Sequence, residues 1–183
     1  DYAGDDEMRE HLEYTHGDDI GVVRLTHGGS VFFRELRGSA LSSWKKVSAT
    51  IPRDDDVVAV EANATSVVVV HTRDELDACD ADLHGVSVHA VRFDRKSGDA
   101  QATLLAPPAC GKEASPFWAG RAGEKIVVTW AERPSAKKPG GTPSAVASAA
   151  TVSARGRTSP RSYCPMAAAD TPTLRWRSAL DIL

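Results

Sequence analysis

One apolar run most constrains what this chain can fold into. Residues 66–71 read Ser-Val-Val-Val-Val-His, and a similar run, Lys-Ile-Val-Val-Thr-Trp, occupies residues 125–130. β-Branched residues favour strands, and a short continuous apolar run between turn residues is typical of a strand covered on both faces. Both runs are therefore predicted to be buried strands of an all-β fold.

The two runs belong to a longer internal match. At an offset of 59 residues Val67 coincides with Ile126, and the preceding segments, 57–62 and 117–122, come into register. The residues between each pair of segments include Asn63 and Gly123, which suit hairpin turns. Each match therefore predicts a first and a second strand joined by a tight turn.

A second match links two other segments. Val-Arg-Leu-Thr at 23–26 resembles Val-Arg-Phe-Asp at 91–94, and each is followed by a Gly-containing turn and a further strand-like segment. In chain order, residues 20–50 are then the last two strands of one unit, 56–108 a complete unit of four strands, and 115–155 the start of a third. Residues 57–105 are predicted to form one antiparallel sheet in sequence order. Four strands in about 60 residues are typical of a β-propeller blade.

The hairpin at residues 123–130, an apolar run closing on Trp, resembles the propeller repeats of secreted bacterial proteins. The resemblance covers about residues 20–155 and implies a partial β-propeller of antiparallel four-stranded blades. The sequence contains neither the Asp-box S-x-D-x-G-x-x-W nor the Gly-His and Trp-Asp pairing of WD40 repeats. A β-sandwich is the alternative fold, and it would place residues 57–62 and 86–94 in different sheets.

The ends of the chain differ from its middle. Residues 1–19 are an acidic N-terminal segment, in which residues 7–14 have enough helix-forming residues for a short exposed helix. Residues 133–173 are rich in Pro, Ser, Ala and Gly and predict a long loop or a partly disordered insertion that interrupts the third unit. Residues 156–183 are expected to be an irregular segment with room for one further strand. Because the sequence starts at Asp1 and stops after a strand-like segment, we expect it to be part of a longer protein.

Composition limits the partners of the chain. It is 42% hydrophobic and 26% charged with a net charge of −3, so no nucleic-acid partner is expected. The longest apolar run is far shorter than the roughly 20 residues of a membrane helix, so no membrane-spanning segment is expected. An incomplete array of blades leaves apolar faces uncovered, which predicts neighbouring blades or self-association.

A cluster of acidic residues is the main candidate binding site. In a four-stranded antiparallel unit, the loop after the second strand and the loop leading to the next unit lie on the same side. This rule brings together Asp54, Asp55, Asp56, Asp77, Asp80, Asp82 and His84. Residues 80–85 resemble the start of a Ca²⁺ loop, but His84 takes an oxygen position and the twelfth position is Val91. We therefore expect a solvated acidic rim that holds no metal or cofactor, with Ca²⁺ bound weakly at most.

The three cysteines have no metal-ligand spacing. Cys79 lies in the predicted loop after the second strand of the complete unit and Cys110 after its fourth, so both fall on one side of the sheet. A Cys79–Cys110 disulfide is predicted, with Cys164 unpaired within the chain. Such a bond implies a secreted, periplasmic or cell-surface protein.

No residue pattern in the chain indicates catalysis. His27-Gly28-Gly29 would form an oxyanion loop only beside a Gly-x-Ser-x-Gly elbow, which the sequence lacks, so it is interpreted as a turn. The favoured function is a non-catalytic binding or scaffold segment of a larger propeller protein with a protein or glycan partner. The alternatives are a fragment of a sialidase-like or other glycan-active propeller enzyme, with its catalytic residues outside this chain, and a purely structural repeat segment.

Overall fold

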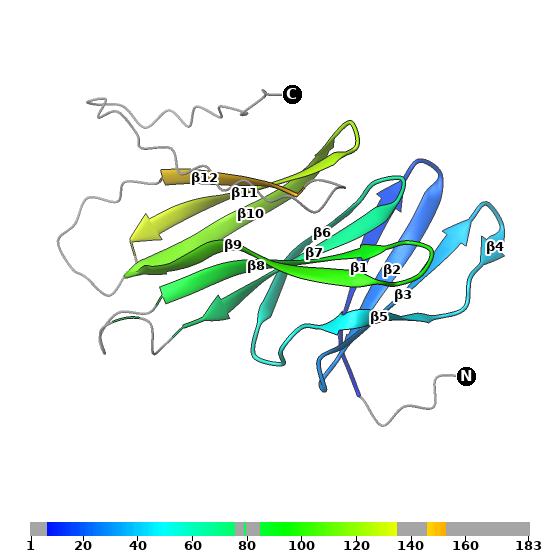
Figure 1. Ribbon diagram of the computed structural model, residues 1–183, viewed down its shortest axis with the longest axis horizontal. Helices are drawn as coiled ribbons and strands as arrows, with labels where there is room; N and C mark the ends of the chain where they lie inside the picture. The colour runs from blue at the N-terminus through cyan, green and yellow to red at the C-terminus, as the bar shows by residue number, and fades with distance from the viewer. Residues whose placement is uncertain (1–6, 76–78, 80–84, 135–145, 153–183) are drawn as a thin grey trace.

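The computed structural model describes residues 7–75, 79, 85–134 and 146–152. These residues contain strands and no helix, and the strands form three antiparallel sheets (Figure 1), which confirms the all-β prediction. The strands are β1 (Met8–His16), β2 (Asp19–Thr26), β3 (Ser30–Arg37), β4 (Ala40–Leu41), β5 (Lys45–Thr50), β6 (Asp56–Ala62), β7 (Ser66–Asp74), β8 (Gly85–Asp94), β9 (Ala100–Cys110), β10 (Lys112–Ala122), β11 (Lys125–Pro134) and β12 (Val146–Val152).

The first sheet has the order β1-β2-β3, with β4 and β5 both paired to β3. It corrects two expectations. Residues 7–14 do not form a helix, because Leu12 and Tyr14 point into the core while His11 and Glu13 point outward, a period of two that only a strand satisfies. In addition, β2 and β3 are the second and third strands of their sheet rather than the third and fourth, since β1 precedes them and β5 follows.

The middle sheet has the order β6-β7-β8-β9, with every neighbouring pair antiparallel. This confirms the sheet predicted for residues 57–105. The β-sandwich alternative put residues 57–62 and 86–94 in different sheets, and both lie in this one. The third sheet has the order β10-β11-β12; β10 and β11 contain the strands expected at 117–122 and 125–130, and β12 adds a third strand.

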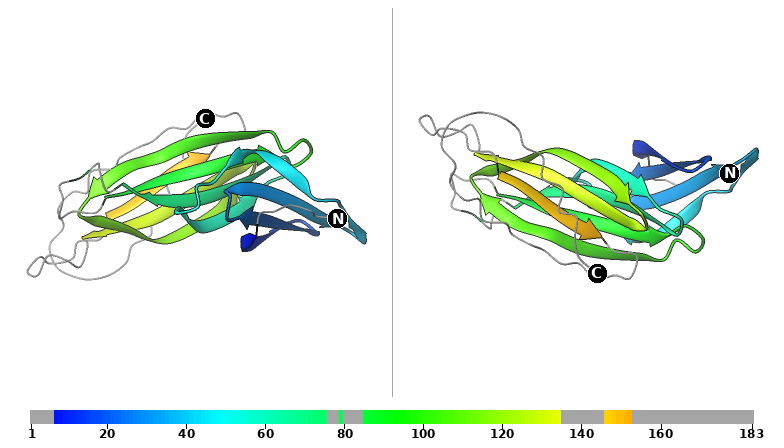
Figure 2. Two further views of the ribbon diagram at one scale, coloured as in Figure 1. Left: turned by 90° about the horizontal axis from the view of Figure 1, so that it is seen from below. Right: turned by 90° about the horizontal axis from the view of Figure 1, so that it is seen from above.

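The middle sheet lies between the first and third sheets (Figure 2), and the apolar core forms one layer on each side of it. Along β7, Val67 and Val69 pack against the first sheet, whereas Val68 and Val70 pack against the third. All four valines are at most 1% exposed, as predicted for a strand covered on both faces. The run on β11 differs: Ile126 and the alternate residues after it are buried, while the residues between them are only partly buried.

The first strand of each sheet lies beside the first strand of the next. Strand β6 contacts β1 on one side and β10 on the other. Their side chains also meet at one end of these strands, where Arg121 of β10 forms an ion pair with Glu61 of β6 at 3.5 Å and donates to Nδ1 of His16 on β1 at 2.8 Å. The three sheets therefore converge along their first strands.

Candidate functional site

Only part of the predicted acidic rim is exposed to solvent. Asp54 and Asp56 are exposed as expected, but Asp55 is 2% exposed. The other members, Asp77, Asp80, Asp82 and His84, lie outside the described residues. The interpretation of Asp55 as a solvated carboxylate is therefore wrong.

Asp55 is instead the centre of a buried polar cluster. Its carboxylate accepts hydrogen bonds from Nε and Nη2 of Arg73 at 3.0 and 3.1 Å, and from Nδ1 of His71 at 2.7 Å. Its backbone carbonyl accepts from Arg9 on β1, whose other terminal nitrogen donates to the carbonyl of Pro52 at 2.9 Å. These contacts join the first and middle sheets at the end where β6 begins beside the last residues of β7.

The cluster continues through a pair of stacked histidines. The rings of His71 and His89 lie 5.2 Å apart between centroids, with 15° between their planes. Nε2 of His89 is 2.8 Å from Oγ of Ser87, and that hydroxyl donates to Oε1 of Glu75 at 3.0 Å. The line of contacts thus runs from the sheet interface to the base of the loop after β7.

Ser87 and His89 have the composition of a nucleophile and its general base, but their hydrogen bonding differs from such a pair. The hydroxyl of Ser87 has two acceptors within reach besides His89, Oε1 of Glu75 at 3.0 Å and the carbonyl of Arg73 at 3.4 Å, so the tautomer of His89 with its proton on Nε2 best completes the hydrogen bonding of this group. An imidazole that donates to a hydroxyl cannot remove its proton. Ser87 is also 1% exposed, so its hydroxyl lies away from solvent.

The environment favours neutral histidines. Burial lowers the pKa of His71 below its ordinary value, although Asp55 opposes the shift, and burial and then Arg73 lower the pKa of His89. Arg73, in contrast, has a raised pKa, chiefly because it donates to Asp55. The positive charge of Arg73 is thus balanced by Asp55, and the neutral forms of His71 and His89 are favoured.

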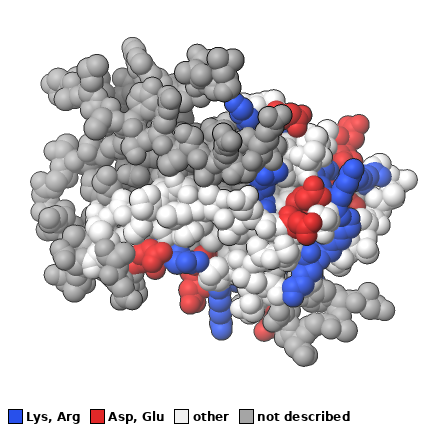
Figure 3. Space-filling view, in the orientation of Figure 1, with Lys and Arg blue, Asp and Glu red and all other residues white. Residues whose placement is uncertain are grey.

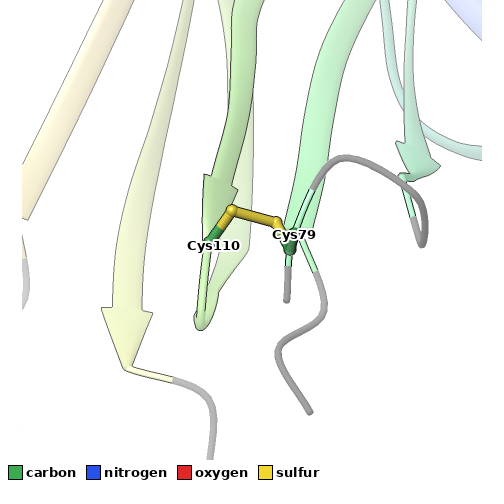
Figure 4. The surroundings of a disulfide bond; sticks show 2 residues. All are labelled: Cys79 and Cys110. Carbon is green, nitrogen blue, oxygen red and sulfur yellow. A yellow bond between two sulfur atoms is a disulfide. The ribbon is translucent and has the colours of Figure 1, made fainter. Parts of the chain in front are cut away.

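The predicted disulfide is confirmed. Cys79 and Cys110 are bonded, with an S–S distance of 2.06 Å and Cα atoms 5.5 Å apart (Figure 4). Gly85, which pairs with Cys110 across the β8–β9 ladder, makes room for the bond, because a Cβ there would lie 2.5 Å from Sγ of Cys79. Cys164 lies outside the described residues.

A second buried cluster lies at the opposite end of the sheets. Arg95, 3% exposed in the turn after β8, donates to Oε1 of Glu35 at 2.5 Å and to Oδ2 of Asp19 at 3.0 Å. It also donates to the carbonyl oxygens of Asn63 at 3.0 Å and of Ala64 at 3.4 Å. Because Glu35 and Asp19 belong to the first sheet, one guanidinium group ties that sheet to the middle one.

Glu35 is held from three sides. Tyr14 donates to Oε1 at 2.8 Å, and Arg37 donates to Oε2 through Nη2 at 2.6 Å and Nε at 3.0 Å. Burial by itself would raise the pKa of Glu35, but hydrogen bonds from Arg95, Arg37 and Tyr14 lower it overall. Burial and the same contact with Glu35 raise the pKa of Tyr14. Glu35 therefore stays charged inside the fold.

Asn63 connects the middle sheet to the third. Its Oδ1 accepts from the backbone N–H groups of Thr65 at 3.0 Å and Ser66 at 2.8 Å, which closes the β6–β7 turn. Its Nδ2 donates to the carbonyl of Glu124 in the β10–β11 turn at 2.7 Å. The expected turn is present here, as is the turn at Gly29, whose φ of 81° suits glycine.

Sequence reasoning missed the long-range pairing of buried polar residues, including that of Asp55, which it named only as an exposed carboxylate. Asp55 lies 16 residues from His71, and Arg95 lies 60 residues from Glu35. One signal was readable: His71 continues the fully buried run of β7, and a buried imidazole needs a hydrogen-bond partner. Among the described residues, no group of three or more His, Cys, Asp or Glu side chains could hold a metal ion.

Comparison with known proteins gives no relative: no family model, no curated protein and no solved structure matches the chain. Within the part of the chain that the structure describes, no helix has the length and apolar character needed to cross a membrane.

Proposed function

We propose that the chain is a segment of a non-catalytic binding or scaffold β-propeller in a secreted or cell-surface protein. The carrying observation is that each sheet runs in chain order and meets its neighbour along the first strand, β6 lying between β1 and β10. A propeller has the same arrangement, with the first strand of each blade nearest the central axis.

Exposed apolar side chains on the outer faces of the first and third sheets favour the presence of further blades. Ile20, Leu36 and Leu41 are cross-strand neighbours on the face of the first sheet that points away from the core. Ile20 is 46% exposed and Leu41 58% exposed. Trp118 of β10, 57% exposed, points away from the core on the third sheet. Apolar groups on a sheet face favour burial by another sheet.

The non-catalytic assignment rests on the burial of the polar residues. Ser87 lies away from solvent beside His89, and the buried charges of Asp55, Glu35 and Arg95 tie the first and middle sheets together. The secreted setting rests on the Cys79–Cys110 bond, because disulfides persist in oxidising compartments.

Sedimentation velocity over a wide range of concentrations tests this assignment. We expect concentration-dependent association, weakened by the double substitution Ile20→Lys and Leu41→Lys on the outer face of the first sheet. Leu104→Lys is the matched control, because Leu104 is 51% exposed but lies on β9 of the middle sheet. A monomer at every concentration with a sharply cooperative melt would refute the proposal, since it would show a complete domain.

A further inference from the structure

The outer face of the first sheet, the one that points away from the middle sheet, combines apolar and basic side chains. Its cross-strand pairs are Ile20 with Leu36, Val22 with Arg34, Arg24 with Phe32, and Phe32 with Lys46. On the neighbouring strand β1, the acidic Glu13 pairs with Val22. Figure 3 shows basic side chains gathered toward the end of the molecule that the first sheet occupies. Aromatic and arginine side chains within an apolar face are typical of the core of a protein interface.

Arg34 is held in the middle row of these pairs by Trp44. The guanidinium carbon of Arg34 lies 4.5 Å from the centroid of the Trp44 ring, and that of Arg24 lies 6.0 Å from it. Nε of Arg34 is buried without a hydrogen-bond partner, and Arg34 forms no ion pair within the part of the chain that the structure describes. Glu13 is separated from it by the width of β2, because Val22 lies between them in the same row. The positive charge of Arg34 therefore has no direct partner among the described residues.

The ion pairs that join described residues of different sheets all have the same direction along the chain. Arg95, in the turn after β8 of the middle sheet, binds Glu35 and Asp19 of the first sheet. Arg121 of the third sheet binds Glu61 of the middle sheet. Each of these pairs therefore joins an arginine of the later sheet to a carboxylate of the earlier one.

We propose that the outer face of the first sheet binds the face of another β-sheet, and that this sheet presents an aspartate or glutamate to Arg34. Arg34 lies on the side away from the middle sheet, so it is the arginine of the later sheet at such an interface. A carboxylate can accept two parallel N–H bonds from a guanidinium group, and the apolar side chains around Arg34 would keep water from the pair. The inference rests on the proposed function, because it names the chemistry of the blade that a propeller places before the first sheet.

An unaltered second copy of the chain supplies a sheet face but lacks the acidic group there. Trp118 and Thr129, which pair on the outer face of the third sheet, are both uncharged. A carboxylate added to that face therefore turns the second copy into a probe for the proposed partner.

Sedimentation velocity of the whole chain with Val127→Glu, Thr129→Glu or Ala131→Glu tests the proposal. These three positions alternate with the buried residues of β11, so they sample the outer face of the third sheet along its length. We expect at least one variant to self-associate about tenfold more tightly than the glutamine variant at the same position, the effect of one charge-assisted hydrogen bond. Adding Arg34→Gln should remove this gain, and added salt should weaken it.

Lys46→Gln is the matched control, because Lys46 carries the same charge on the same face but lies beside Phe32, with Nζ 5.9 Å from its ring centroid. It should keep the gain. Three results would overturn the proposal: no glutamate variant associates more tightly than its glutamine counterpart, the gain survives Arg34→Gln, or Lys46→Gln removes it equally. None of them alters the association of the unaltered chain, so the carboxylate partner and the propeller assignment fail separately.

Discussion

Replacing Arg95 with Met should lower the free energy of unfolding by about 3–5 kcal/mol, the usual cost of removing one partner from a buried ion pair. The guanidinium group is 3% exposed and donates to two carboxylates and two carbonyl oxygens across the sheet interface. Without it, Glu35 stays charged and 3% exposed, with only Arg37 as a charged partner. The loss of the compensating charge, more than the loss of hydrogen bonds, determines the size of the effect.

Urea denaturation at a low, fixed protein concentration measures this effect without interference from association. Arg37→Met is the control, because Arg37 binds the same carboxylate but its side chain is 52% exposed; it should cost about 0–1 kcal/mol. Adding Glu35→Gln to the Arg95→Met variant should recover part of the loss, because no uncompensated charge then remains. Equal effects of the Arg95 and Arg37 substitutions would refute the reasoning.

Three further predictions concern other parts of the fold. Because the fold lowers the pKa of both His71 and His89, the unfolded chain takes up protons at a higher pH than the folded chain does. The free energy of unfolding should therefore fall as the pH drops below about 6.5 and level off below the lowered pKa values. Denaturation at pH 7.5 and 5.5 measures this difference, which should be smaller for His89→Gln. Cys110→Ser should lower the free energy of unfolding by about 3–4 kcal/mol in the same assay, because the bond joins residues with a sequence separation of 31. Non-reducing peptide mapping of the unaltered chain should recover the Cys79–Cys110 peptide pair. Asn63→Ala removes both the acceptor that closes its turn and the donor to Glu124, so it should lower the free energy of unfolding by about 1–3 kcal/mol; an unchanged value in the same assay would contradict this role.

The middle sheet was predictable because its signals are local. The four valines of β7 can be buried on both faces only if sheets lie on both sides, and the turns at Asn63 and Gly98 limit where the strands can end. The disulfide followed from strand order alone, because the loops after β7 and β9 must emerge at the same side of an antiparallel sheet.

The candidate site was less predictable because composition does not specify burial. Asp54, Asp55 and Asp56 are identical in sequence terms, yet only Asp55 points inward, toward His71 and Arg73. The strand β1 was obscured in another way: its outward residues are charged, so its two inward residues, Leu12 and Tyr14, were too few to outweigh the helix-forming composition.

The two polar clusters also explain how sheets with similar cores keep their relative positions. Half of the buried residues in the two core layers are valines, which share one shape, so a shift of one sheet along another would still bury much apolar surface. A shift would nevertheless separate Asp55 from Arg9 at one end of the interface and Arg95 from Glu35 at the other. Each separation would leave a buried charge or carbonyl group without its partner, which costs more than the apolar contacts could return. The apolar core therefore supplies the burial, while Asp55 and Arg95 fix the alignment of the first and middle sheets.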